Sequence, residues 1–256
     1  MKIYVCVKHV PDSAANIVIF KKNQIDKNIS FLMNPYDEHA VTEAVKLKDQ
    51  FASSEVVAVC LGPDDAQKTL RSAMEMGADR SILITAEEKK DSITTARALK
   101  AAIENEDGRP GIIFTGCESI DDAGMQTMFR IGAAFDFPVA SNIVNLSIKH
   151  GKAIVESEKE GGIRDVYELS LPCVLGAGRG LNTPAYPTFP QIVKARKKEI
   201  KKIDIQTLAI EQPMSSMTIV ELKAFVKNRT PREIKGSPKD AAKELVRILH
   251  DEAKVI

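Results

Sequence analysis

Runs of hydrophobic residues alternate with helical patterns along the first half of the chain. The uninterrupted apolar runs are typical of strands buried on both faces of a sheet. Such strands are predicted at 2–10, 56–62, 81–85 and 111–116. Between them, apolar residues recur three and four positions apart, as in amphipathic helices. Helices are predicted at 35–49, 63–77, 92–105 and about 125–136, the first of them opened by Asn34-Pro35.

This alternation predicts an α/β fold with a parallel sheet that carries helices on both faces. Ligands of such sheets bind beyond the carboxyl ends of the strands, where backbone N–H groups and helix N-termini converge. The loops after Val10, Leu61 and Thr115 therefore form the predicted ligand edge.

The pattern changes after about residue 140. Residues 140–177 read as short strands with glycine turns at Gly151 and Gly161-Gly162, which predicts a β meander appended to the sheet. Three prolines within 181–190 predict an extended irregular loop, and a basic segment follows it. Residues 17–32 are expected to form a short hairpin.

The end of the chain differs in composition from the rest. From about Pro213 it is polar and contains proline, and it ends in a short amphipathic helix around Leu245 and Leu249. We expect an α/β domain over 1–212 and a C-terminal arm with a helix over 213–256. The pattern alone leaves open whether that helix docks on a partner or on its own domain.

The composition of the chain argues against several classes of function. The 256 residues include 36 Lys and Arg against 35 Asp and Glu, a balance that argues against a nucleic-acid-binding protein. No apolar run approaches the roughly 18 residues of a membrane span. The N-terminus reads as a strand rather than a targeting peptide, so we expect a cytoplasmic protein. The four cysteines lack a CxxC spacing and predict buried, reduced thiols.

The sequence carries no recognisable catalytic motif. GxSxG, HExxH, Walker A and GxGxxG patterns are missing, so neither a catalytic residue nor a metal site is predicted. The segment with most chemical content is 115–127, TGCESIDDAGMQT, which leaves a strand through Gly116 and ends at a helix start. Small residues and free N–H groups there suit a phosphate. Asp121 and Asp122 can cap the helix, bond ribose hydroxyls or bind Mg²⁺, and an acidic capping loop without a ligand is the alternative.

Eight segments, in their order and spacing, resemble the β subunit of electron transfer flavoproteins over nearly the whole chain. They are VCVKHVPD (5–12), MNPYDEHAVTEAVKLKD (33–49), EVVAVCLGP (55–63), TLRSAMEMGADR (69–80), TGCESIDDAGMQT (115–127), EKEGG (158–162), LNTPAYPTFPQIVKARKK (181–198) and KELVRIL (243–249). The resemblance implies an α/β fold of the adenine nucleotide α-hydrolase-like type.

The resemblance also implies a function. The family is a heterodimer whose α subunit carries FAD, while the β subunit holds a structural AMP and is not itself an enzyme. Electrons pass from a flavin dehydrogenase, such as an acyl-CoA dehydrogenase, to a membrane quinone oxidoreductase or another acceptor. Two alternatives stay open. One is an electron-bifurcating flavoprotein subunit with a second FAD and NADH oxidation, and the other is a stand-alone ATP- or AMP-binding module of the universal-stress-protein kind.

Site residues follow from matching positions. The resemblance implies nucleotide contacts at Cys6, Asn34, Pro35, Tyr36, Asp37, Leu61, Gly116, Cys117, Glu118, Ser119, Ile120, Asp121, Asp122, Ala123, Gly124, Met125, Gln126 and Thr127. Tyr36 matches an aromatic residue that reaches toward the flavin. Phe189 occupies the anchor position of a partner-recognition loop near 182–198, where Leu is usual. Lys194 and Lys197 follow it, and Glu158 matches an acid that faces the flavin domain of the α subunit.

The nucleotide loop departs from the usual family pattern, G-K-Q-A-I-D-D-D-C-N-Q-T-G. Here Cys117-Glu118 replaces the lysine-containing start, and Ala123, Gly124 and Met125 replace later positions. A lost lysine and a gained glutamate remove charge that favours a phosphate. The bifurcating pattern D-G-D-T does not match either, whereas Gln126-Thr127 agrees with the AMP type. AMP is therefore the expected ligand and a second FAD the alternative.

Overall fold

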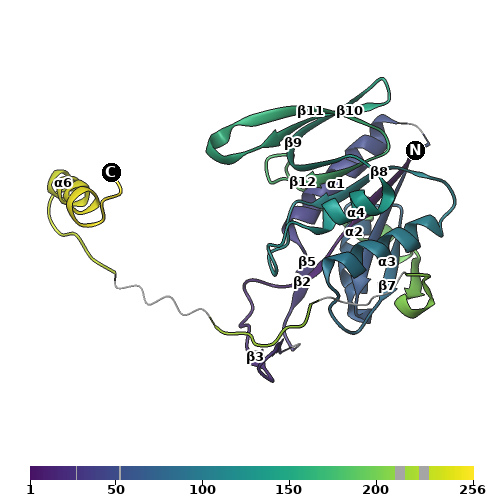
Figure 1. Ribbon diagram of the computed structural model, residues 1–256, viewed down its shortest axis with the longest axis horizontal. Helices are drawn as coiled ribbons and strands as arrows, with labels where there is room; N and C mark the ends of the chain where they lie inside the picture. Colours follow the sequence, from purple (N-terminus) through teal and green to yellow (C-terminus); the bar gives the residue numbers. More distant parts are fainter. Residues whose placement is uncertain (27, 52, 211–216, 225–230) are drawn as a thin grey trace. The chain divides into compact units, whose positions relative to one another are not determined.

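The predicted buried strands assemble into a nine-stranded sheet in the computed structural model (Figure 1), which describes residues 1–26, 28–51, 53–210, 217–224 and 231–256. The strand order is β11-β10-β9-β12-β8-β1-β6-β7-β13. The strands are β1 (Lys2–Cys6), β6 (Glu55–Gly62), β7 (Arg80–Thr85), β8 (Pro110–Gly116), β9 (Val139–Lys149), β10 (Lys152–Glu158), β11 (Arg164–Ser170), β12 (Cys173–Ala177) and β13 (Ile200–Asp204). Neighbours from β9 to β13 run parallel, and β10 and β11 continue the sheet in the antiparallel sense.

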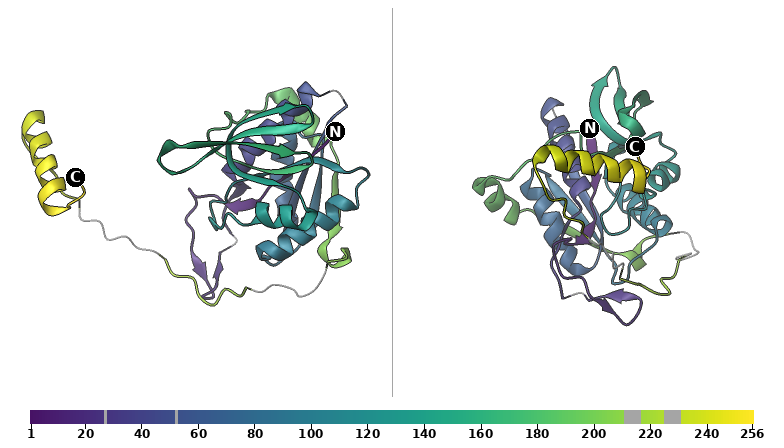
Figure 2. Two further views of the ribbon diagram at one scale, coloured as in Figure 1. Left: turned by 45° about the horizontal axis from the view of Figure 1, so that its top comes forward. Right: turned by 90° about the vertical axis from the view of Figure 1, so that its left-hand side faces the viewer.

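Helices cover both faces of this sheet (Figure 2). On one face lie α1 (Pro35–Gln50) and α2 (Gln67–Glu75), and on the other lie α3 (Ser92–Glu104) and α4 (Thr127–Phe135). Successive residues of β1 serve the two cores in turn, since Ile3 packs on the α1 side and Tyr4 on the α3 side. This double burial explains the unbroken apolar runs and confirms the predicted α/β class.

The first predicted strand, 2–10, is wrong in length. β1 ends at Cys6, because the N–H of Lys8 donates to the Asp37 carboxylate instead of to a neighbouring strand. The chain then leaves the main sheet, and β2 (His9–Pro11) pairs with β5 (Phe31–Met33). The hairpin expected within 17–32 is present as β3 (Ile19–Phe20) and β4 (Gln24–Ile25).

Two further expectations about the second half need correction. β9, β10 and β11 form the expected antiparallel meander, but β12 runs parallel between β9 and β8. The irregular loop predicted over 181–190 ends earlier, because α5 (Phe189–Arg196) begins at Phe189. The N–H of Thr188 donates to Gln191 Oε1 at 2.7 Å, and proline is tolerated in a first helical turn, so Pro190 does not block the helix.

Helix starts also differ from the predicted ones by a few residues. α4 begins at Thr127 rather than near 125, because Ala123 and Met125 adopt φ values of 49° and 51° that a helix excludes. A single 3₁₀ turn precedes α2. The 3₁₀ turns of the described chain are Asp64–Ala66, Glu160–Gly162 and Ile205–Thr207.

The chain divides into two compact units, Met1–Val220 and Glu221–Ile256. The predicted boundary between 212 and 213 lies outside the described residues. The second unit holds the expected amphipathic helix, α6 (Pro238–Arg247), which continues as a π-helical turn over Ile248–Glu252. Leu245 and Val246 of α6 are exposed. Within the described ranges, no helix combines the length and apolar character needed to cross a membrane.

Burial predicts where substitutions will destabilise the fold. Ile113, in central strand β8, is fully buried, whereas Ile163 is 63% exposed. Ile113→Ala should lower the free energy of unfolding by about 2–5 kcal/mol, because it leaves a cavity between packed layers. Ile163→Ala should change it by no more than about 0.5 kcal/mol. Urea unfolding of both variants checks this, and equal losses would contradict the assigned core.

Candidate functional site

The candidate site lies where the strand order reverses. From β1 the chain places β6 and then β7 on one side, and β8 returns to the other side of β1. The loops that leave the carboxyl ends of β1 and β8 therefore part there and open a crevice, the usual ligand position in such sheets. Lys8 follows β1 at this edge, and the segment Gly116–Thr127 begins at the end of β8.

Asp37, in the first turn of α1, sits at the centre of this edge. Its Oδ2 accepts the N–H of Lys8 at 2.7 Å, and its Oδ1 accepts the N–H of Gly116 at 2.9 Å and Asn34 Nδ2 at 3.1 Å. Burial raises the pKa of this carboxyl to about 7, although these three hydrogen bonds oppose the shift. One carboxylate thus joins the ends of two neighbouring strands.

Asn34 and Tyr36 extend this contact along the loop. Asn34 precedes α1 as predicted, but its side chain bonds to the loop: Nδ2 donates to the Glu118 carbonyl at 2.8 Å, and Oδ1 accepts the N–H of Ile120 at 3.1 Å. The hydroxyl of Tyr36 donates to Glu118 Oε1 at 2.5 Å. The start of α1 therefore fixes the first residues of the loop.

Gly116 leaves β8 where there is no room for a side chain. A Cβ at this position would collide with Asp37 Oδ1 and would lie 2.6 Å from the Cβ of Tyr36. The glycine is therefore required by the close approach of α1.

Two lysines balance the acidic pair of the loop. Lys8 Nζ lies 2.7 Å from Asp121 Oδ1, 2.7 Å from Asp122 Oδ2 and 3.1 Å from Ser119 Oγ. Lys89, from the loop after β7, forms ion pairs with the same two carboxylates. Although burial raises it, these bonds hold the pKa of Asp122 below its usual value. The positive charge that the loop lacks in its own sequence is thus supplied by two other segments.

The start of α4 offers backbone donors at the same edge. Among the described residues, no side chain caps the first turn of α4, so its N–H groups face outward at Thr127. Gln126 is held by Ser92, whose Oγ lies 3.2 Å from Gln126 Oε1, and by Arg130 Nη2 at 2.9 Å. A helix start is an environment that favours an anion, and the loop that leads into this one is bound by Lys8 and Lys89.

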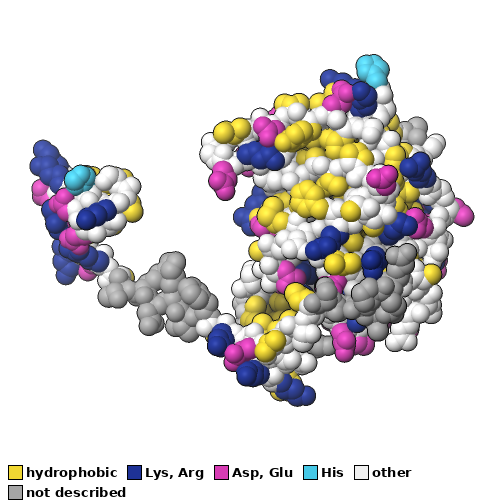
Figure 3. Space-filling model, viewed as in Figure 1, with side chains coloured by type: hydrophobic (Ala, Val, Ile, Leu, Met, Phe, Trp, Pro, Cys, Tyr) yellow, Lys and Arg dark blue, Asp and Glu magenta, His cyan; other side chains and the backbone are white. Residues whose placement is uncertain are grey.

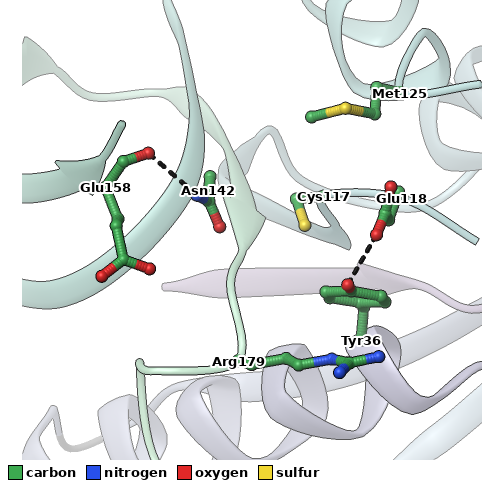
Figure 4. Close-up of a pocket in the computed structure, with 7 residues that line it drawn as sticks. All are labelled: Tyr36, Cys117, Glu118, Met125, Asn142, Glu158 and Arg179. Carbon is green, nitrogen blue, oxygen red and sulfur yellow. Dashed lines mark hydrogen bonds between the residues drawn. The ribbon is translucent and has the colours of Figure 1, made fainter. Parts of the chain in front are cut away.

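A cavity of about 270 Å³ opens beside the loop (Figure 4). Its lining residues come from α1, the 116–127 loop and the ends of β9, β10 and β12, and they are Tyr36, Cys117, Glu118, Met125, Asn142, Glu158 and Arg179. The Arg179 guanidinium lies 4.9 Å from the centre of the Tyr36 ring. Asn142 Nδ2 donates to the Glu158 carbonyl at 2.8 Å. The cavity thus combines an aromatic face with a cation and two carboxylates, a surface suited to a planar polar ring.

Most of the predicted nucleotide-binding residues come together at this edge. The segments 34–37 and 116–127 touch each other directly, Cys6 is buried at the end of β1, and Leu61 is the penultimate residue of the adjacent β6. Glu158 lines the cavity. Phe189 and Lys194 lie elsewhere, on α5, and Lys197 caps the end of this helix. Arg71 of α2 donates to the carbonyl of Lys198, just beyond the helix, at 2.8 Å.

Four polar residues of the site were not predicted. Lys8 and Arg179 follow strands β1 and β12, so their position at strand ends was an available signal. Lys89 and Asn142 gave no such signal, because only the packing of separate loops brings them to the edge. All four cysteines, which belong to the described part of the chain, are buried and free, as predicted. The described residues contain no group of His, Cys, Asp and Glu side chains that could hold a metal ion.

Comparison with known proteins gives a consistent result. The family model for the electron transfer flavoprotein domain matches residues 24–208. "Electron transfer flavoprotein subunit beta" of Bacillus subtilis is 31% identical over the full length of both chains, and that of Syntrophomonas wolfei is 33% identical over the full chain and 98% of the relative. "Electron transfer flavoprotein subunit beta, mitochondrial" of Arabidopsis thaliana is 34% identical over the full length of both.

The crowding at Gly116 makes a testable prediction. Gly116→Ala should lower the free energy of unfolding by about 1–3 kcal/mol, because the methyl group must displace Asp37 or the backbone of α1. Gly124→Ala is the matched control, since no described atom lies within 4 Å of a Cβ added there. Urea unfolding and limited proteolysis of the loop measure both effects. Equal stability of the two variants would show that the loop does not need this close approach.

Proposed function

The chain belongs to the electron transfer flavoprotein family as one of its β subunits, and on that premise we propose that it holds AMP at the carboxyl edge of its sheet. In this role it is an electron-carrier subunit rather than an enzyme, and it completes the flavin site of an α subunit. The observation that carries the proposal is the meeting of Lys8, the start of α1 and the 116–127 loop at the point where the strand order reverses.

The residues at this edge fit a nucleoside monophosphate. Lys8, Lys89 and the N–H groups at the start of α4 would hold the phosphate, and Asp121 and Asp122 would accept bonds from ribose hydroxyls. AMP supplies no redox chemistry and acts as a structural ligand. The chain's own part is to bind it and to keep the loop ordered.

The cavity beside the loop fits the second part of the proposal, which is that the chain completes the flavin site of an α subunit. Tyr36, Arg179 and Glu158 would face the flavin that the α subunit carries, as Figure 4 shows them around one hollow. FAD supplies the one- and two-electron chemistry when it is bound. Arg179, stacked on Tyr36, places a positive charge where a reduced and negatively charged flavin ring would be stabilised.

We assign docking of the electron donor to the loop that leads into α5. Phe189 and Tyr186 are 77% and 93% exposed. Lys194 follows on α5, and Lys197 caps the end of that helix. The root of this loop is fixed, because Asn182 Nδ2 donates to the His39 carbonyl at 3.0 Å and to Glu43 Oε2 at 2.9 Å. An exposed aromatic anchor with a cationic rim suits a flavin dehydrogenase of the acyl-CoA dehydrogenase kind, with a membrane quinone oxidoreductase as acceptor.

Two surfaces remain for the α subunit. Hydrophobic side chains gather over the meander on the face drawn in Figure 3. Among the residues of β11 and the turn before it, Ile163, Val166 and Tyr167 are exposed. The arm and α6 supply the second surface, with Leu245 and Val246 on the outside of the helix. We propose that the α subunit covers both, and that the predicted 213–256 arm is its docking segment. A cytoplasmic location stays a prediction.

Nucleotide content tests the proposal and its alternatives. An acid extract of the complex purified with its α subunit should contain one FAD and one AMP per heterodimer. Two FAD and no AMP would instead identify a bifurcating subunit that takes electrons from NADH. A chain that remains monomeric and colourless when produced with its α subunit would favour the stand-alone nucleotide-binding module.

Substitution of the anchor tests the docking surface. Phe189→Ala should weaken association with the donor dehydrogenase about 30-fold, the equivalent of ~2 kcal/mol for a buried aromatic anchor. Phe20→Ala, at a residue that is 50% exposed in the β3–β4 hairpin, is the matched control. The rate of electron transfer at subsaturating dehydrogenase measures the effect. An unchanged rate for Phe189→Ala would refute the anchor.

A further inference from the structure

We propose that Asp37 is the positioning residue of the nucleotide loop and that it acts without touching the nucleotide. Its carboxylate holds residues 116–120 in the conformation that receives AMP, and this inference rests on the proposed function. The family resemblance implies a direct contact, whereas the geometry points to an indirect role.

The first argument is that both oxygens of the Asp37 carboxylate already accept hydrogen bonds from the protein. Asp37 is only 4% exposed, and its two oxygens already accept three hydrogen bonds, from Lys8, Gly116 and Asn34. Two of these donors are main-chain N–H groups at the ends of β1 and β8. The carboxylate thus acts on the protein chain, and Lys8 Nζ, carried on the residue it fixes, reaches the loop acids.

The second argument is the pattern of contacts along the loop. Side chains at the start of α1 form hydrogen bonds with the N–H of Gly116, the carbonyl of Glu118 and the N–H of Ile120. These three groups belong to every second residue of the loop. Asp37 makes the first of these bonds, and Asn34 makes the other two while its Nδ2 also donates to Asp37. The first turn of α1 therefore supports the loop much as a neighbouring strand would, and the carboxylate orients the amide that completes the set.

The third argument concerns protonation. Burial raises the pKa of Asp37 to about 7, so the carboxyl takes up a proton near neutral pH. A loosened loop would return the carboxyl to water and bring its pKa back towards the ordinary value of aspartic acid, so proton uptake favours the ordered loop. The titratable groups that face Asp37 are Lys8 and Cys6 at β1, Cys60 of β6 and Cys117 of the loop. Burial raises the pKa of all three thiols, to about 11 for Cys117, so they stay protonated in this range. The loop should accordingly be held more firmly as pH falls through 7.

The test compares AMP binding by the wild-type heterodimer and by Asp37→Asn between pH 6 and 8. Asparagine keeps the shape of the side chain but replaces one acceptor oxygen with an NH₂ donor, so one N–H group loses its partner and the variant should bind AMP at least tenfold more weakly at pH 8. The advantage of the wild type should not shrink as pH falls to 6, because proton uptake favours the ordered loop. The AMP phosphate titrates in the same range. The ratio of the two affinities is therefore the readout.

Asp49→Asn is the matched control, because Asp49 is exposed near the other end of the same helix. It should follow the wild type at every pH. A wild-type to Asp37→Asn affinity ratio that falls to one at pH 6, or equal affinity at pH 8, would overturn the proposal.

A measurement without nucleotide separates this inference from the AMP assignment. Hydrogen exchange at the amides of Gly116 and Ile120 in the wild-type complex, corrected for intrinsic rates, should slow as pH falls from 8 to 6, because opening exposes Asp37 and lowers its pKa. This holds whichever nucleotide the acid extract contains, and it remains measurable if Asp37→Asn does not assemble. Protection that does not change with pH would show that the Asp37 carboxylate does not order the loop.

Discussion

The functional edge of this fold depends on one buried carboxylate. A charged group away from water is costly unless hydrogen bonds surround it, and the chain meets that condition with the N–H groups of Lys8 and Gly116 and the amide of Asn34. These donors come from two strands and one helix start. The same three bonds therefore end β1, aim Lys8 at the loop acids and fix the exit from β8, so the crevice at the reversal of strand order has a defined shape.

Charge at this edge is arranged between segments rather than within one. The loop contributes the aspartates 121 and 122, while Lys8 and Lys89 come from the ends of β1 and β7. An electrostatic site assembled in this way tolerates a loop that has lost a lysine and gained Glu118, because positive charge arrives from elsewhere. Glu118 in turn becomes a structural partner, since it accepts the hydroxyl of Tyr36.

α1 links the two surfaces that an electron-carrier subunit needs. Its first turn holds the nucleotide loop through Asn34 and Asp37, and its next turns hold the root of the loop before α5 through His39 and Glu43. The helix is buried against β1 and β8 along its inner side, so it provides a rigid base for both. The proposed docking loop and the proposed nucleotide loop thus share one structural element, although their exposed residues lie on different parts of the molecule.

The sequence by itself determined the α/β class, the order of the buried strands and helices, and the loop after β8 as the ligand edge, because these follow from local apolar periodicity and from Gly116 at a strand end. The family resemblance added proposed roles for residues 34–37 and for Phe189. Only the tertiary structure decided that β1 stops at Cys6, that β12 joins the parallel strands, and that Lys89 and Asn142 reach the site. Those outcomes depend on contacts between residues far apart in the chain, and no local pattern encodes such contacts.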